Sequence, residues 1–187
     1  MANINDFKSR LKGGGARANQ FKVTLPFPGF ASVGGETSDM AFLCTATSTP
    51  ASTISDTPIA FRGRTLYVAG DRTFDTWSTT VLNDTDFKIY RACERWLNGI
   101  NNLEDNEGIV NPSSYQTDGH IHHLSRNGST LKTWTMRGVF PTALPGIGLD
   151  YSTNDAVETF DVTWRYQYFE TDMHKGAGPG SINWGGR

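Results

Sequence analysis

The sequence has few of the features that most binding and catalytic classes need. Charged residues make up 19% of its 187 residues, against about 25% in ordinary globular proteins. Seventeen basic and nineteen acidic residues give a formal net charge of −2 at pH 7. The chain therefore lacks the basic excess that holds nucleic acid by neutralising its phosphates, and we do not expect tight DNA binding.

The first residues also show no targeting or membrane-insertion signal. Residues 1–6 contain no basic start and no apolar run, so we expect neither a secretory signal nor insertion into a membrane. No Gly-x-Ser-x-Gly element is present, which argues against the nucleophile of an α/β-hydrolase.

Cysteine is scarce as well. Cys44 and Cys93 are far apart and have neither metal-binding nor redox spacing. We expect both to be reduced and buried, and we expect no cofactor.

Apolar and polar residues alternate in many segments of the chain. At 187 residues the chain suits a single domain. Period-2 patterns predict strands with one buried face, and Asn127-Gly128 predicts a type I′ turn between two of them. The predicted strands are residues 20–25, 40–48, 120–126, 130–140 and 156–169.

One segment has helical spacing instead. In residues 85–98 and just beyond, Ile89, Cys93, Trp96 and Ile100 recur at i, i+4, i+7 and i+11, and Gly99 is expected to end the helix. We therefore predict a mainly β, single-domain antiparallel β-barrel or sandwich with one packed α-helix, spanning residues 1–170. The Gly-rich residues 171–187 are predicted to form a separate tail.

A long hairpin is expected at residues 59–82. Runs of β-branched and aromatic residues flank Gly70, Asp71 and Arg72, which predicts a tight turn with Gly70 at positive φ. Residues 51–58 before it are polar and β-prone. They suit either an arm that reaches off the domain or an ordinary surface loop.

The N-terminus predicts a short helix. Ile4, Phe7 and Leu11 have helical spacing, Asn3 or Asn5 can cap the helix, and Gly13 to Gly15 would end it. The glycine run lacks the lysine and the preceding strand of a phosphate-binding loop. We interpret it as a hinge, and the helix as a segment that docks on a neighbour.

Histidines supply the strongest candidate for a metal site. In a strand, Asp118, His120 and His122 share one face, beside His123, and two imidazoles with a carboxylate could hold iron or zinc. However, no carboxylate follows in residues 124–128. The alternative is a set of solvent-facing or interface histidines that titrate near neutral pH.

Several segments together resemble a known family. Residues 68–75 read Val-Ala-Gly-Asp-Arg-Thr-Phe-Asp, followed by Trp77 and by Val-Leu-Asn-Asp at 81–84. With Arg-Ala-Asn-Gln-Phe at 17–21, Phe-Leu-Cys-Thr-Ala-Thr at 42–47, Arg-Gly-Val-Phe-Pro-Thr at 137–142 and Glu-Thr-Phe-Asp-Val-Thr at 158–163, this order resembles the tail tube proteins of contractile-tailed, T4-like bacteriophages.

The resemblance implies a structural virion protein rather than an enzyme. Its subunits would form hexameric rings, stacked into a tube inside the tail sheath, with baseplate and tail-terminator proteins at the ends and assembly in the host cytoplasm. DNA would pass through the channel without binding tightly. The alternatives are a tube protein of a phage-derived contractile injection particle, a metal-dependent β-barrel enzyme and a monomeric carbohydrate-binding β-sandwich.

Two sets of residues follow as predicted contact sites. In residues 156–169, Phe160, Val162, Trp164, Tyr166 and Tyr168 need apolar cover, so the opposite face would line the channel. That face carries Thr159, Asp161, Thr163 and Arg165. The arm at 51–63 would contact the next ring, through Thr53, Ile54, Ser55 and Asp56.

Overall fold

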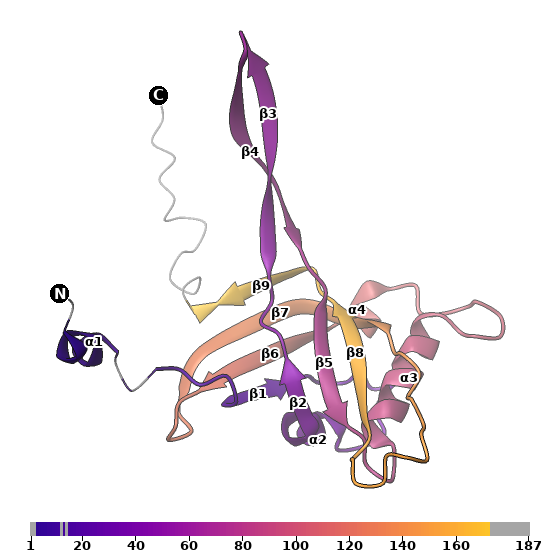
Figure 1. Cartoon of the computed structure of the whole chain (residues 1–187). Helices are drawn as coiled ribbons and strands as arrows, with labels where there is room; N and C mark the ends of the chain where they lie inside the picture. Colours follow the sequence, from indigo (N-terminus) through magenta and orange to yellow (C-terminus); the bar gives the residue numbers. More distant parts are fainter. Residues whose placement is uncertain (1–2, 12, 14, 173–187) are drawn as a thin grey trace.

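The computed structural model describes residues 3–11, 13 and 15–172 of the chain. Within them it contains nine strands and four helices (Figure 1). The strands are β1 (Phe21–Thr24), β2 (Cys44–Thr47), β3 (Ser52–Phe61), β4 (Arg64–Phe74), β5 (Trp77–Leu82), β6 (Thr117–Leu124), β7 (Thr130–Ala143), β8 (Thr159–Arg165) and β9 (Tyr168–Thr171). The helices are α1 (Ile4–Arg10), α2 (Glu36–Leu43), α3 (Lys88–Ile100) and α4 (Pro112–Tyr115).

Seven strands form one curved antiparallel sheet. Its order is β1-β6-β7-β8-β5-β2, and β9 pairs with β7. β3 and β4 form a separate two-stranded sheet, the ribbon, which projects from the body (Figure 1). The predicted mainly β fold is confirmed.

Strand β7 carries the sheet around a bend. Its first half pairs with β6 and β9, and its last residues pair with β8. At the bend, Gly138 has φ +65°, and a Cβ there would lie 2.9 Å from the Gln167 side chain. Only glycine satisfies both conditions without strain.

The core lies between the curved sheet and α3. Ile89, Cys93 and Trp96 of α3 are buried, as its helical stripe predicts. Trp96 packs against Trp164 of β8, with ring centroids 5.6 Å apart, and its indole N–H donates to the carbonyl of Tyr115. A buried tryptophan with its N–H satisfied contributes a large apolar area and leaves no unpaired donor.

Both ends of α3 differ from the expected positions. The helix begins at Lys88, whose backbone N–H donates to Asp84 Oδ1, while Phe87 adopts a left-handed conformation. At the other end the helix continues past Gly99 to Ile100. A Cβ at Gly99 would lie 2.3 Å from the ring of Phe30, so this glycine allows close packing rather than ending the helix.

The strand predicted at residues 40–48 is half wrong. Residues Glu36–Leu43 form α2, and only Cys44–Thr47 form a strand. The Glu36 carboxylate accepts hydrogen bonds from the backbone N–H groups of Gly34 and Val33, which fixes the turn that leads into the helix. In this helix Met40 is buried and Phe42 is 80% exposed.

The last predicted strand is broken in two. β8 ends at Arg165, and the Gln167 N–H donates to the carbonyl of Arg137, which redirects the chain so that β9 pairs with β7. Phe160, Val162, Trp164 and Tyr166 are buried as predicted. The core assignment of Tyr168 is wrong: it lies beyond the break and is 47% exposed.

Two turns also differ from the predictions. The long hairpin turns at Arg62 and Gly63, with φ +45° and +82°, whereas Gly70, Asp71 and Arg72 lie inside β4. Gly70 is needed there because a Cβ would meet Ser55 Oγ of β3 at 2.5 Å. The β6–β7 hairpin is confirmed, but only Gly128 of its predicted type I′ pair has positive φ.

The N-terminal helix is present and Asn3 caps it, since its side chain accepts from the Asn5 N–H. Thr171 lies in β9, and Asp172 accepts a hydrogen bond from the Thr133 N–H. The rest of the predicted C-terminal tail falls outside the described residues. Among the helices of the described part, none is long and apolar enough to span a membrane.

Candidate functional site

One face of strands β5 and β8 is covered by short polar side chains. Alternation along both strands sends Trp77, Val81, Phe160, Val162 and Trp164 into the core. The opposite face, here called the hydroxyl face, carries Ser78, Thr80, Thr159, Asp161 and Thr163, with Leu82 and Arg165 at its two ends. Within this face Ser78 lies opposite Thr163, and Thr80 lies opposite Asp161.

Hydrogen bonds hold the hydroxyl face in place. The Thr80 hydroxyl donates to Asp161 Oδ1 at 2.6 Å, and the Thr142 hydroxyl of β7 donates to the carbonyl of Thr163. The four residues predicted to line the channel all lie on the side of β8 away from the core. Thr159, Asp161 and Arg165 are exposed, and Thr163 is half-buried.

Buried tryptophans stiffen the sheet beneath this face. Trp77 and Trp164 are fully buried with ring centroids 5.9 Å apart. Their indole N–H groups donate to the hydroxyls of Thr47 and Thr79 respectively. The buried side is thus satisfied, and the hydroxyl face rests on a rigid layer.

The sheet has open edges on both sides of this face. Strand β2 pairs with β5 on one side and has no partner on the other among the described residues. Strand β8 pairs with β5 along its length, but β7 reaches only Thr163, Trp164 and Arg165. Within the described part of the chain, the other side of residues 159–162 is therefore also open to a further strand. Unpaired edges of this kind are pairing sites.

The root of the ribbon is fixed to the body. The Tyr166 hydroxyl donates to the carbonyl of Ala51, just before β3, and the Tyr166 ring packs against Phe74 at the end of β4. Phe74 also contacts Phe169, with centroids 5.8 Å apart. Burial is the main reason that the pKa of Tyr166 is raised, and nearby Asp75 adds to it, so its hydroxyl keeps its proton.

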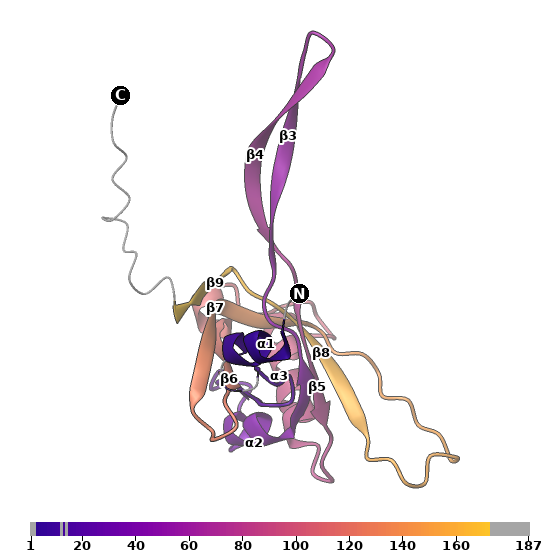
Figure 2. The same ribbon diagram turned by 60° about the vertical axis from the view of Figure 1, so that its left-hand side comes forward.

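The outer part of the ribbon projects away from the body (Figure 2), and its large apolar side chains are exposed. In the β3–β4 register Ile59 lies opposite Leu66 and Phe61 opposite Arg64. Ile59, Phe61, Leu66 and Val68 therefore share one side, and Tyr67 points to the other. Their exposed fractions are between 45% and 67%.

The four arm residues predicted to contact a neighbour occupy a different part of the ribbon. Thr53, Ile54, Ser55 and Asp56 lie in its inner half, where a bulge between Ile54 and Asp56 interrupts the pairing with β4. Their alternation contains a single large apolar residue, Ile54, which is 50% exposed. The shared apolar side of Ile59, Phe61, Leu66 and Val68 was not predicted, because the hairpin turn was expected at Gly70 and lies at Gly63.

The histidines lie on β6, but their carboxylate partner is engaged elsewhere. His120 and His122 share one side, with rings stacked 6.1 Å apart, and their Nδ1 atoms lie 3.1 Å from the hydroxyls of Thr135 and Thr133. The Asp118 carboxylate instead pairs with Arg137 and accepts from the Gly138 N–H.

The electrostatics of the histidine pair disfavour a cation. Burial, together with the charges of His120 and Lys22, lowers the pKa of His122, and Asp172 offsets this only in part. His123 points to the other side of the strand, toward Trp134. No group of three His, Cys, Asp or Glu in the described residues could hold a metal ion.

Both cysteines are free and buried, as expected. Burial raises the pKa of Cys44 to about 12 and raises that of Cys93 further. Thiols of this kind are poor nucleophiles at neutral pH.

Comparison with known proteins identifies the family. A family model described as phage tail tube protein matches residues 16–172. The chain is 33% identical over 168 residues to the tail tube protein of Serratia phage KSP90, covering 89% of this chain and 95% of the relative. It is 30% identical over 156 residues to the tail tube protein of Enterobacteria phage T4, covering 83% and 91%.

A solved structure shares the fold. It is a chain of the sheath–tube complex of an extracellular contractile injection system, which aligns with a TM-score of 0.53 at 14% identity and covers 91% of this chain and 98% of that one. The sequence resemblance to tail tube proteins is confirmed, and the chain belongs to the phage tail tube protein family.

Proposed function

We propose that this tail tube protein forms hexameric rings that stack into the inner tube of a contractile phage tail, through which DNA passes into the host. The observation that carries the proposal is the sheet itself: two open edges flank a face of small polar side chains, and a tryptophan core backs that face. Such a sheet can continue from subunit to subunit until the ring closes.

Ring closure would join the open side of β8 in one subunit to β2 in the next. Within the described residues β2 is an edge strand, and β8 is unpaired on one side along residues 159–162, so joining the two extends the hydroxyl face into the next subunit. Closure removes two unpaired edges per subunit, which would otherwise promote aggregation.

The hydroxyl face would then line the channel. Thr159, Asp161, Thr163 and Arg165 give each subunit one acid and one base on this strand. Since DNA binding by phosphate neutralisation needs clustered cations, the passing DNA would find few sites that hold it.

Stacking of rings would use the ribbon. An isolated two-stranded hairpin is only marginally stable in water, and the outer side chains Ile59, Phe61 and Leu66 have little apolar cover within the subunit. A neighbouring ring would supply that cover. The inner residues would add contacts nearer the root, polar ones from Thr53, Ser55 and Asp56 and an apolar one from Ile54.

The assembled tube would lie within the tail of the virion. We propose the sheath as its outer partner, and baseplate and terminator proteins at its ends. The structural relative comes from a sheath–tube complex, which supports this arrangement. That relative belongs to an injection system, whereas the relatives of 30% and 33% identity come from phages, so we favour a phage tail over an injection particle.

Electron microscopy tests the assembly. The purified chain, concentrated and negatively stained, is expected to show six-fold rings or tubes of even bore. A chain that stays monomeric by sedimentation at every concentration, with no rings on the grid, would contradict the proposal.

Lysine substitutions test the channel. Thr159→Lys with Thr163→Lys is expected to leave tubes intact but slow DNA ejection from virions, more strongly at low salt, because counterions screen the added charges. The matched control places the two lysines on exposed loop residues, at Ser152 and Asn154. Equal ejection rates for both variants would show that the hydroxyl face does not meet DNA.

A further inference from the structure

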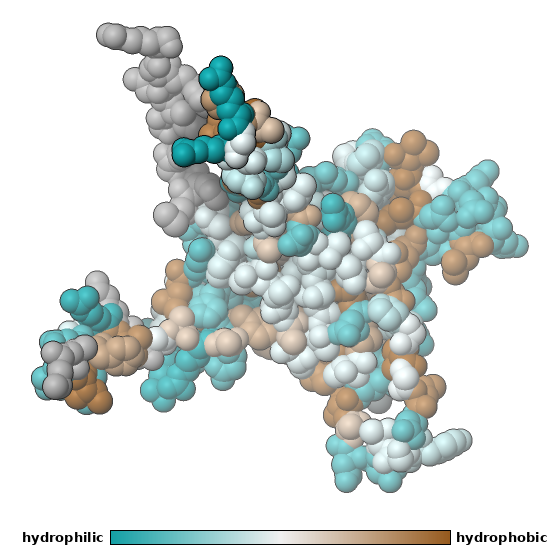
Figure 3. Space-filling view, turned by 45° about the horizontal axis from the view of Figure 1, so that its top comes forward, coloured by the Kyte–Doolittle hydropathy of each residue, from teal (hydrophilic) through white to brown (hydrophobic). Residues whose placement is uncertain are grey.

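Helix α1 lies apart from the body and exposes an apolar side. Ile4, Phe7 and Leu11 recur at i, i+3 and i+7, with exposed fractions of 68%, 65% and 45%. Figure 3 shows this helix set off at one side of the molecule, with hydrophobic side chains on its surface. The family model matches residues 16–172, so α1 lies outside the part that it matches.

A groove of matching character runs along α3. It has a volume of about 670 Å³ and is lined by Tyr90, Leu97, Leu103 and Leu144, with Glu94 and Arg95 among its polar residues. Leu103 is 93% exposed. In Figure 1, α3 and the loop that follows it lie on the side of the body opposite to α1.

Charges on the two elements are complementary. The first turn of α1 carries Asp6, and its last turn carries Lys8 and Arg10. The groove offers Arg95 and Glu94, and the loop beside it adds three exposed acids, Glu104, Asp105 and Glu107. A fit that sets the last turn of α1 beside this loop would pair Lys8 and Arg10 with Glu104 and Asp105.

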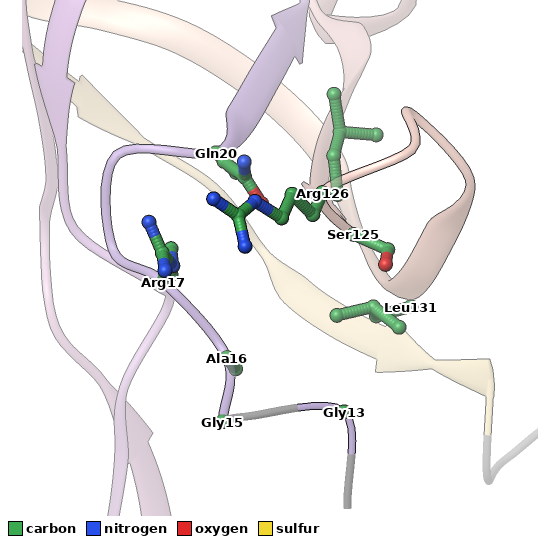
Figure 4. A pocket seen from close by; sticks show the side chains of 9 residues that line it. Gly13, Gly15, Ala16, Arg17, Gln20, Ser125, Arg126 and Leu131 are labelled. Carbon is green, nitrogen blue, oxygen red and sulfur yellow. The ribbon is translucent and has the colours of Figure 1, made fainter.

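A second basic feature lies where the α1 link joins the body. Arg17 and Arg126 line a hollow of about 270 Å³ together with Gln20 and Ser125 (Figure 4). Neither arginine forms an ion pair with a residue that the structure describes. The acidic loop 103–107 of another copy would supply the missing carboxylates.

We propose that α1 of one subunit docks in the α3 groove of a second copy of this chain, with Ile4, Phe7 and Leu11 against Leu97, Leu103 and Leu144. The proposal rests on the proposed ring assembly and names a contact within it. Because the donor side and the acceptor side lie at opposite ends of one subunit, the contact is heterologous and repeats around a closed ring.

Cysteine crosslinking between mixed subunits tests the contact. Phe7→Cys and Leu103→Cys chains are purified separately, mixed under assembly conditions and mildly oxidised. A disulfide-linked dimer is expected at a rate roughly tenfold or more above the control pair, Phe7→Cys with Tyr151→Cys, because docking raises the local thiol concentration. Cys44 and Cys93 are buried and contribute little background.

Placing both cysteines on one chain shows whether the α1 in the groove comes from another subunit or from the same subunit. Phe7→Cys with Leu103→Cys is expected to give a ladder of linked subunits on a non-reducing gel. A fast monomer band from an internal disulfide would show that α1 folds onto its own groove and would overturn the proposal. Equal rates for the test and control pairs would overturn it too.

Reversing the charges on α1 and on the loop after α3 tests the contact independently. Lys8→Glu with Arg10→Glu is expected to weaken ring formation, and Glu104→Lys with Asp105→Lys on the same chain is expected to restore it. Failure of the second pair to rescue the first would contradict the assigned partners. Rings of the Phe7→Cys with Leu103→Cys chain that form without crosslinked subunits overturn this inference alone, whereas absence of rings from the unaltered chain overturns the proposed function first.

Discussion

Tryptophan 164 shows how one residue separates the two faces of the sheet. It is fully buried, packs between Trp77 and Trp96, and donates to the Thr79 hydroxyl. Its neighbour Thr163 points away from the core, and its backbone carbonyl accepts a hydrogen bond from the Thr142 hydroxyl. The core position therefore excludes charge, while the adjacent position accepts it.

Aspartate at these two positions is expected to have opposite effects. Trp164→Asp should prevent folding, because an unpaired buried charge costs several kcal/mol and the lost ring leaves a cavity. Thr163→Asp should fold and change stability by less than about 1 kcal/mol. Circular dichroism with urea titration measures both, and a folded Trp164→Asp beside an unfolded Thr163→Asp would reverse the assigned faces.

Glu36 makes stability depend on pH. Burial alone raises its pKa, but hydrogen bonds from the Ser32 side chain and from the backbone N–H groups of Gly34 and Val33 lower the pKa below the ordinary value of 4.5. The charged form is thus favoured in the folded state. Its contribution is fully present above pH 4.5 and is lost as the pH falls through the lower folded value.

Glu36→Gln is expected to lower the free energy of unfolding by about 1–3 kcal/mol at neutral pH, because it removes a charged acceptor from two N–H groups. The difference should shrink in acid, where the native carboxyl is protonated as well. Urea unfolding at neutral and acid pH measures it, with Glu104→Gln on an exposed loop as the control. A constant difference at all pH values would contradict the assigned role.

At the scale of elements, the ribbon combines a fixed root with an uncovered outer half. Tyr166 and Phe74 hold the ends of β3 and β4 to the body, whereas Phe61 and Leu66 are 67% and 60% exposed. The direction of the ribbon is thus set by the subunit. Its outer surface is available to a partner.

Phe61→Asp with Leu66→Asp is therefore expected to stop rings from stacking without unfolding the subunit, since both side chains are already exposed. Electron microscopy should show rings in place of tubes. Thr65→Asp, on the other side of the ribbon from these residues, serves as the control and should still give tubes. Long tubes from the double variant would show that the apolar side does not join rings.

At the scale of the whole molecule, the residues that the structure describes include unpaired strand edges and exposed apolar side chains, so assembly should contribute to stability. Binding between folded subunits stabilises them by mass action. The melting temperature is expected to fall on dilution, once sedimentation shows that rings dissociate. A melting temperature that stays constant over about a hundredfold dilution of a dissociating sample would contradict coupling between assembly and folding.

The sequence by itself determined the class of fold and the family. Period-2 patterns in β1 and β8 and the α3 stripe decide which side chains are buried, because burial follows the local repeat of strand and helix. Segments such as Arg137–Thr142 carry the resemblance to tail tube proteins, and the β7 bend at Gly138 lies in that segment. The hydroxyl face follows from the same alternation as the core.

Only the tertiary structure decided where the chain turns and what the glycines do. Glycine is typical of turns and helix ends, which is why Gly70 was predicted to form a turn and Gly99 to end a helix. Each glycine is instead needed because a distant residue approaches its backbone closely: Ser55 at Gly70 and Phe30 at Gly99. The break between β8 and β9 likewise depends on a hydrogen bond from Gln167 to Arg137. These contacts join residues far apart in sequence, and a local pattern contains no information about such approaches.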